Sequence, residues 1–273
     1  MGAERAKNIG DWGEIIAVDT ATDEILWRMK VDGMPHHMSV TRDGKLMFVP
    51  YYNTWWTAVI DLEKREVIKK LFTGHGSHGT KISPDGKRLY VGSMMNDFLS
   101  IIDIPSLEVI DVIGFRDAVR PFVMTKDEKT MYVQQSHMHG FWIVDLEKRE
   151  KVKTVMLPEL PASVEMPEMY PHNVNHGIAL SPDERLLLVN GSIVNYVAVY
   201  KHPELELIKT IPVGDDPNAI AFSKDGKFAY VSNRASDDLS IISIEQLEEV
   251  KRMPLGDLPQ RMVVINVPEG GDD

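Results

Sequence analysis

The sequence of 273 residues contains no cysteine. This absence excludes disulfide bonds, thiolate ligands and iron–sulfur clusters, so any bound metal must use histidine, carboxylate or carbonyl groups. Long apolar runs are also missing, since none approaches the roughly 18 residues of a membrane span. The first residues lack the apolar segment of a secretory signal. We therefore expect no membrane insertion, and a chain that carries no signal peptide as given.

Basic residues are scarce relative to acidic ones. Lys and Arg total 30 against 41 Asp and Glu, which gives a net charge of −11. This balance argues against nucleic acid as a partner. The sequence also lacks a G-x-S-x-G elbow, a P-loop and a dinucleotide-binding motif. A small-molecule ligand is the expected partner; nothing indicates a protein partner, and a monomer is the default expectation.

A repeat organises the chain. Similar strings place an aspartate at Asp43, Asp85, Asp127, Asp183 and Asp225, with spacings of 42, 42, 56 and 42 residues. Each aspartate is followed by Gly or Glu and joins an apolar run to an alternating run, as a β-hairpin turn requires. Two further strands follow in each unit, for example in "LSIIDIPSLEVIDVIG". Four strands per repeat of about 40 residues are typical of a propeller blade.

The ends of the chain predict how such a fold closes. The start, "IIAVDTATDEILWRMKV", resembles the outer half of a blade, and "RMVVINV" near the end resembles an inner strand. Pairing of the N- and C-terminal segments would complete a sixth blade and remove an exposed sheet edge. Its remaining strand would come from residues 3–10. We therefore predict an all-β, six-bladed β-propeller of four-stranded antiparallel blades, with residues 1–273 forming a single domain.

Several segments of the sequence resemble those of a known family. "YVSN" at residues 230–233, "IIAVDTATDEIL" and "IPVGDDPNAIAFSKDGKFAYVSN" are similar to the YVTN family of β-propeller repeats, which is related to surface-layer and quinoprotein-associated propellers. The resemblance covers nearly the whole chain. It implies a propeller fold and an extracytoplasmic location, but little about activity, because this fold supports scaffolds, lyases, lactonases and redox enzymes.

One register position gathers polar residues. The residues seven positions before the five aspartates are His36, His78, Arg120, His176 and Asn218. One further repeat of 42 residues after Asn218 leads to Gln260. In a propeller this position begins the innermost strand at the rim of the central channel. Polar rim residues often bind only water or backbone groups. Eight of the nine histidines, however, lie in segments expected on one face, and histidine is the commonest metal-ligating side chain.

We therefore predict a metal site held by His36, His78 and His176, with His137 or His139 as a fourth ligand. Ligation by imidazole alone favours copper or iron, with zinc or manganese as further possibilities, over Mg or Ca. Because side chains alternate along a strand, we expect only one of His36 and His37 to face the axis, and the register favours His36.

Other residues are predicted to bind or process a substrate. Arg120 takes the place of a histidine and suits a bidentate grip on a carboxylate, although pairing with Asp117 is equally consistent with the sequence. Apolar loops of the same face contribute a possible pocket lining and, in Met94 and Met95, possible thioether ligands. The residues assigned to substrate binding are Arg120, Trp55, Trp56, Asn218 and Gln260.

The long spacing between the third and fourth aspartates is an insertion of 14 residues, at about residues 158–172. Three of its prolines, Pro158, Pro161 and Pro167, disfavour regular structure, so it is either a lid over the channel mouth or a tolerated surface loop. Arg120, His139, Tyr170 and His172 are the predicted catalytic residues, the last three as proton carriers.

Three functions fit this pattern. The first is a metal-dependent oxidoreductase or oxygenase that acts on a small organic substrate, which is anionic if Arg120 binds a carboxylate. The second is a lyase or hydrolase in which the metal is a Lewis acid. The third is a non-catalytic propeller that serves as a binding or scaffold module.

Overall fold

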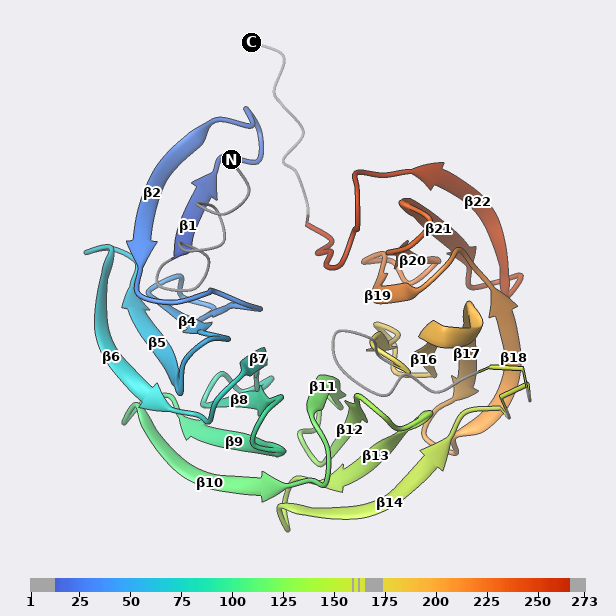
Figure 1. The fold of residues 1–273 in the computed structure, drawn as a ribbon, viewed down its shortest axis with the longest axis horizontal. Helices are drawn as coiled ribbons and strands as arrows, with labels where there is room; N and C mark the ends of the chain where they lie inside the picture. Colours follow the sequence, from blue (N-terminus) through green and yellow to red (C-terminus); the bar gives the residue numbers. More distant parts are fainter. Residues whose placement is uncertain (1–12, 159, 162, 165–173, 266–273) are drawn as a thin grey trace. The chain divides into compact units, whose positions relative to one another are not determined.

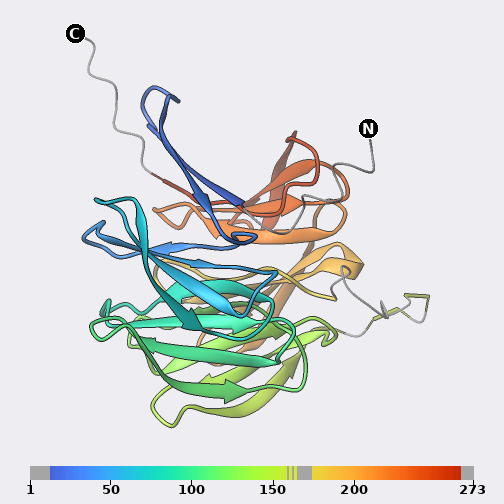
Figure 2. The ribbon, with the colours of Figure 1, turned by 60° about the vertical axis from the view of Figure 1, so that its left-hand side comes forward.

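The computed structural model describes residues 13–158, 160–161, 163–164 and 174–265. This part of the chain is built of 22 β-strands and one turn of 3-10 helix, η1 (Ser192–Val194) (Figures 1 and 2). The strands form one two-stranded and five four-stranded sheets, with the strands of each sheet adjacent in chain order. Within the described residues, no helix is long and apolar enough to cross a membrane.

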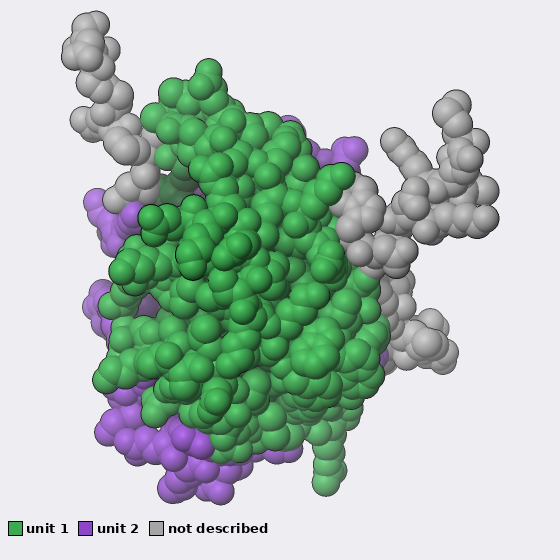
Figure 3. Space-filling model, turned by 90° about the vertical axis from the view of Figure 1, so that its left-hand side faces the viewer, with its two compact units in different colours: residues 1–116, 265–273 green, residues 117–264 purple. Residues whose placement is uncertain are grey.

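The chain divides into two compact units, residues 1–116 with 265–273 and residues 117–264 (Figure 3). The first unit contains the two-stranded sheet and two four-stranded sheets. Its strands are β1 (Gly13–Val18), β2 (Ile25–Val31), β3 (Ser39–Val40), β4 (Leu46–Pro50), β5 (Trp56–Asp61), β6 (Glu66–Phe72), β7 (Ser77–Ile82), β8 (Arg88–Ser93), β9 (Phe98–Asp103) and β10 (Glu108–Gly114).

The second unit contains three four-stranded sheets. Its strands are β11 (Val119–Met124), β12 (Thr130–Gln135), β13 (Gly140–Asp145), β14 (Glu150–Met156), β15 (Ile178–Leu180), β16 (Leu186–Gly191), β17 (Tyr196–Lys201), β18 (Glu206–Pro212), β19 (Pro217–Phe222), β20 (Phe228–Asn233), β21 (Asp238–Ser243) and β22 (Glu248–Pro254).

The repeated aspartates form the predicted turns between the first and second strands of each four-stranded sheet. In each turn the hydroxyl of the Ser or Thr two residues earlier donates to the aspartate Oδ1, at 2.6–2.7 Å. Gly44, Gly86 and Gly226 follow with φ of 70°, 76° and 71°, a region that glycine occupies without steric cost. Hydrogen bonds from Ser181 and Arg185 lower the pKa of Asp183 to about 2.

Apolar side chains from neighbouring sheets pack into shared clusters within each unit. In the first unit, Phe48 and Val59 of one sheet pack with Leu89, Val91 and Ile102 of the next, all fully buried. A second cluster joins the two-stranded sheet to the sheet of β3–β6. Burial of these faces is the main source of stability in such sheets, and it holds consecutive sheets of the unit in contact.

The second unit has the same organisation. Phe141 and Leu187 belong to a cluster that joins its first and second sheets, and Leu188 and Val231 belong to one that joins its second and third. The central strands β16 and β17 carry apolar side chains on both faces, and they therefore contribute to both clusters. The predicted pattern of four-stranded antiparallel sheets is therefore found in both units.

The predicted closure involves the ends of the described chain. Residues 255–265 carry no strand assignment, and β1 pairs with β2 in a sheet of two strands. Residues 3–10, expected to supply a further strand, lie outside the described residues. Pairing of the termini, a sixth four-stranded blade and a single domain stay predictions.

Candidate metal centre

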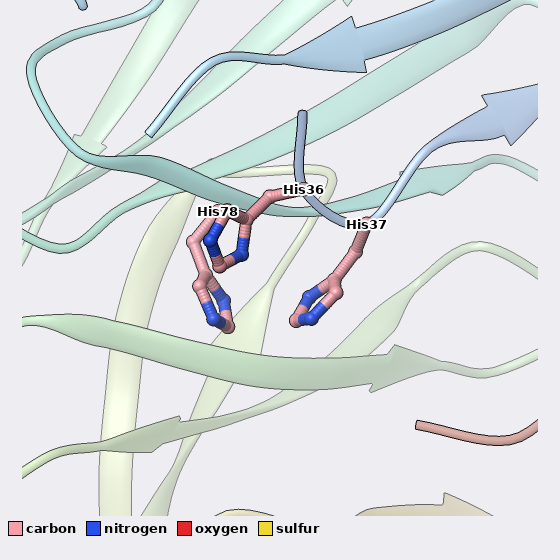
Figure 4. Close-up of side chains that lie close together, drawn as sticks. All are labelled: His36, His37 and His78. Atoms are coloured by element: carbon pink, nitrogen blue, oxygen red, sulfur yellow. The ribbon is translucent and has the colours of Figure 1, made fainter. Parts of the chain in front are cut away.

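Three histidines of the first unit gather their rings at one place. His36 and His37 lie just before β3, and His78 is the second residue of β7. Figure 4 shows the three rings close together, and one ring nitrogen from each lies within 4.8 Å of the others. His78 is buried, with 5% of its surface exposed, whereas His36 and His37 are half-buried. The cluster therefore combines a fixed imidazole with two that solvent can reach.

The backbone before β3 explains why both consecutive histidines take part. Pro35 opposes Tyr51 and Ser39 opposes Phe48, so four steps along one segment match three along the other. This count leaves one extra residue, as in a β-bulge, which bends the chain and re-aims side chains. Both rings join His78, because strict alternation of side chains applies only to a regular strand. Which of the two faces the channel axis stays a prediction.

Hydrogen bonds from Thr80 hold this segment against β7. The Thr80 hydroxyl contacts the backbone carbonyl of His37, to which it donates, and lies 2.7 Å from the Ser39 hydroxyl. His36 donates its backbone N–H to the carbonyl of Pro50 at 2.9 Å. These contacts position the two loop histidines relative to His78 through backbone groups and the hydroxyls of Thr80 and Ser39.

His78 also lies at a bulge. Ser77 opposes Ser93 and Thr80 opposes Val91, so His78 and Gly79 together face a single residue of β8. The ring centroid of His78 lies 4.1 Å from that of His37 at 78°, and 4.9 Å from that of His36 at 40°. The tilted rings direct their edges, which carry the nitrogens, into a common space.

The geometry suits a transition metal. In a tetrahedral site with bonds of about 2.1 Å, ligand nitrogens lie roughly 3.4 Å apart, so the widest pair need approach by only about 1.4 Å. Imidazole is a good ligand for copper, iron, nickel and zinc, whereas Mg and Ca prefer oxygen. Three protein ligands would leave at least one coordination position for water or substrate.

The corresponding position of the second unit also lies at bulges. In β11 the register shifts between Val119 and Phe122, around Arg120, and in β19 it shifts between Pro217 and Ala219, at Asn218. The same local backbone device therefore positions Arg120 and Asn218. Their side chains carry different chemistry from the three imidazoles of the first unit.

His176, a predicted ligand, is buried beside Asn218. Its Nδ1 lies 3.0 Å from the backbone carbonyl of Asn218, which acts as acceptor, so the neutral ring carries its lone pair on Nε2. Burial, followed by the positive charges of Arg261 and Arg120, keeps the pKa of His176 well below its usual range. A neutral imidazole is the form that binds a metal, but the neighbouring guanidinium groups disfavour a cation.

Arg120 is buried, and its Nε donates to the Ser136 hydroxyl at 2.6 Å. Asn218 is 2% exposed. Gln260 is exposed in a segment with no assigned strand. The structure thus brings Arg120 and Asn218 near His176 within the second unit.

His137 and His139 lie in the loop between β12 and β13. His137 makes two contacts with Asp117: its ring Nδ1 lies 2.9 Å from Oδ1, and its backbone N–H donates to Oδ2 at 2.6 Å. His139 is buried, and its Nε2 lies 2.9 Å from the carbonyl of Pro158 and 3.1 Å from the Tyr196 hydroxyl. Burial is the main cause that lowers the pKa of His139.

The aromatic loop of the first unit is exposed. Trp55 stacks on Phe72 with centroids 5.7 Å apart and 11° between planes, and Trp56 meets the same ring edge-on at 5.6 Å. Trp55 and Trp56 are 44% and 40% exposed. Tyr170 and His172, predicted as catalytic, lie outside the described residues.

Two contributors were not recognised from the sequence. One is Thr80. The sequence did offer a signal for it, because Thr80 is polar whereas the residues at the same register position of the other repeats are apolar: Met38, Phe122, Ile178 and Ile220. Tyr52 is the other, with its ring centroid 5.1 Å from that of His36. Tyr52 lies shortly after β4 and packs against the His36 ring.

Comparison with known proteins agrees with this architecture. The family model described as YNCE-like β-propeller matches residues 6–172, and the model described as lactonase, 7-bladed β-propeller matches residues 153–263. No curated protein matches the sequence.

Among solved structures, Kuenenia stuttgartiensis hydrazine synthase is similar with a TM-score of 0.56 and 19% identity, over 84% of this chain and 89% of that one. At this identity the likeness concerns the fold alone. The family matches confirm the predicted resemblance to YVTN-type repeats. Because the first model covers more than half of the 273 residues, the chain belongs to the YNCE-like β-propeller family and has an all-β propeller fold.

Proposed function

We propose that the protein binds a transition metal through His36, His37 and His78 and that this centre is catalytic. The observation that supports the proposal is the approach of three imidazole nitrogens to within 4.8 Å of one another. Three imidazoles this close together, one of them buried, can direct their nitrogen lone pairs at a single cation, which they would then bind together. Copper or iron is the proposed metal, with zinc or manganese second.

The proposed reaction class is oxidoreductase or oxygenase chemistry on a small, anionic organic substrate. Copper or iron supplies redox chemistry when bound. The half-buried His36 and His37 lie on the side of the cluster that solvent reaches, so a substrate would enter from that side. His78, buried at the bulge of β7, would hold the opposite side rigid.

The wider site rests on the repeat register. His137 and His176 as additional ligands, His139, Tyr170 and His172 as proton carriers, and Trp55, Trp56, Asn218 and Gln260 as substrate contacts stay predictions. Arg120 is proposed to bind a carboxylate of the substrate, which is supported by its burial and its hydrogen bond to Ser136. Replacing each residue by alanine and measuring metal content separates ligands from substrate contacts.

A second candidate is a hydrolase in which the metal acts as a Lewis acid. The match of residues 153–263 to a lactonase family model favours this alternative over a lyase. Metal identity distinguishes the candidates, because zinc or manganese supports hydrolysis and copper or iron supports redox chemistry. A protein that holds no metal and tolerates loss of the histidines would instead be a binding module.

We also propose that six blades close through the chain ends. The two-stranded sheet of β1 and β2 has the pattern of an outer half-blade, and "RMVVINV" has that of an inner strand. Pairing them would leave no exposed sheet edge. Deleting residues 261–273 should then lower the denaturation midpoint of the whole chain, and an unchanged midpoint would contradict closure.

Elemental analysis tests the central proposal. The protein is expressed with Cu, Fe, Zn and Mn supplements, purified, and analysed beside His78→Gln and a matched control, His202→Gln. We expect His78→Gln to hold about one equivalent of metal less than the unaltered protein, and the control to match the unaltered protein. Equal metal contents in His78→Gln and the unaltered protein would overturn the assignment.

A further inference from the structure

A second pair of metal-binding atoms lies in the first unit, outside the three-histidine cluster. His75 Nδ1 and Met95 Sδ are 2.6 Å apart. The pair is accessible, since Met95 is 50% exposed and His75 half-buried. An imidazole nitrogen and a thioether sulfur thus face each other at the surface, in a loop whose chemistry the proposed function does not use.

The backbone around His75 is clamped on both sides. Its N–H donates to Asn96 Oδ1 at 2.5 Å, and its carbonyl accepts from the Ser93 hydroxyl at 2.8 Å. The Met95 N–H donates to the same carbonyl at 3.2 Å. These hydrogen bonds connect the loop before β7 directly to the loop after β8, so His75 and Met95 are held as neighbours by the backbone.

Glycine makes this approach possible. Gly76 has φ of 72°, and a Cβ at this residue would lie 2.9 Å from the Met95 Cγ. Any larger residue would therefore clash with the methionine side chain and would also be strained by its backbone conformation. The loop "TGHGS" is shaped to accept Met95 beside His75.

An aromatic ring borders the pair. The ring centroid of Trp55 lies 5.2 Å from that of His75, and Trp55 is itself held by stacking on Phe72. An indole face attracts a cation that is close to it. The indole has no lone pair to compete for a metal, but it would shield a bound ion from one side.

The donor types select the metal. Thioether sulfur is a soft ligand that favours Cu(I), while Mg and Ca require oxygen. Zinc in proteins is bound by cysteine, histidine and carboxylate groups, and the pair offers only one of these. The flexible methionine side chain can move by the roughly 1 Å or more that an ion between the two atoms requires.

We propose that His75 and Met95 form a surface site for the cuprous ion, with Trp55 over one side. The site is separate from the three-histidine centre and does not depend on it. Its chemistry is binding of Cu(I) without a change of oxidation state. His75 lies three residues before His78 on the same segment, so the two sites occupy one part of the first unit.

X-ray absorption of the Cu(I)-loaded full chain under anaerobic conditions tests this site, because copper bound by Met95 gives a sulfur shell at about 2.3 Å. The sulfur shell should be present in the unaltered protein and in His78→Gln, and lost in Met95→Leu. The matched control is Met156→Leu, which makes the same substitution at a methionine that is 58% exposed. Competition with a chromophoric Cu(I) chelator should show at least tenfold weaker binding at this site for Met95→Leu and His75→Phe, and no change for Met156→Leu.

The outcomes separate this site from the proposed function. A sulfur shell that is absent from the unaltered protein, or that persists in Met95→Leu, overturns the His75–Met95 site. Loss of one copper equivalent in His78→Gln with the sulfur shell retained leaves both sites standing. Equal copper stoichiometry in His78→Gln and the unaltered protein overturns the three-histidine centre alone. Leucine is close to methionine in size, so Met95→Leu is expected to fold normally.

Discussion

The two units of the chain use one backbone device for two kinds of chemistry. In both, the residue seven positions before a turn aspartate lies where the first strand carries an extra residue. In the first unit this position directs His36 and His78, with His37, toward one another. In the second unit it holds Arg120 against Ser136 and brings Asn218 to His176.

This contrast shows what the repeat does and does not determine. The bulge decides where a side chain goes, and the residue type decides what it can bind. Imidazoles in the first unit suit a cation. The guanidinium of Arg120, together with that of Arg261 close to His176, suits an anion.

Replacing His78 by glutamine should weaken metal binding roughly 100-fold or more, because loss of a direct ligand costs at least as much as loss of a group that supports one. Replacing Asn218, its register equivalent in the second unit, by alanine should leave metal affinity unchanged. Titration against a competing chelator measures both. Equal losses in the two variants would mean that the units do not differ as described.

The buried His176 should make the stability of the metal-free protein depend on pH in the acid range. Its folded-state pKa is depressed, so the unfolded chain binds a proton that the folded chain refuses. Stability is then unaffected above about pH 6.5 and falls as the pH decreases below it, by up to ~1.4 kcal/mol per pH unit. His176→Gln should reduce this slope by that amount.

The measurement is chemical denaturation of metal-free protein at pH 7.5, 6.5 and 5.5. His202→Gln serves as the control and should keep the slope of the unaltered chain. Parallel pH dependences in His176→Gln and the unaltered protein would show that His176 is not held neutral by its surroundings.

Thr80→Val gives the first unit the apolar residue found at the same register position of the second. It removes the hydroxyl that contacts the His37 carbonyl and Ser39. We expect about 1 kcal/mol loss of stability and up to tenfold weaker metal binding, since a supporting contact of the site is lost. Thr80→Ser should restore most of the affinity, and its failure to do so would assign the effect to packing.

Asparagine at a turn aspartate should have the smallest effect, and the same one in both units. Asp85→Asn and Asp183→Asn remove a charged acceptor from a hydroxyl and a backbone N–H. The denaturation midpoint should fall by no more than a few degrees, with metal binding intact. Because the folded-state pKa of Asp183 is about 2, its contribution is complete above about pH 4 and is lost as the pH falls toward 2.

The turns and the sheets were predictable because their causes are local. A hydroxyl, an aspartate and a glycine within four residues specify a tight turn, and the alternating runs around them specify strands. Two of the turns have glutamate, Glu128 and Glu184, where the others have glycine. The repeat is still recognisable, because these glutamates also adopt a positive φ.

The details of the site were less predictable. His36 and His78 followed from the register, but His37 did not, because the extra residue before β3 depends on how Pro35 and Ser39 pair with the next strand. The support from Thr80 is a contact between two sheets of the first unit, 43 residues apart in sequence. Alternation along one strand contains no information about such a contact.

Anomalous diffraction from crystals of the metal-loaded protein, recorded on both sides of the absorption edge of the bound metal, locates the ion. We expect a peak about 2.0–2.2 Å from one ring nitrogen each of His36, His37 and His78. A fully loaded crystal with no peak among these three rings, or with its peak beside His176 in the second unit, would contradict this expectation.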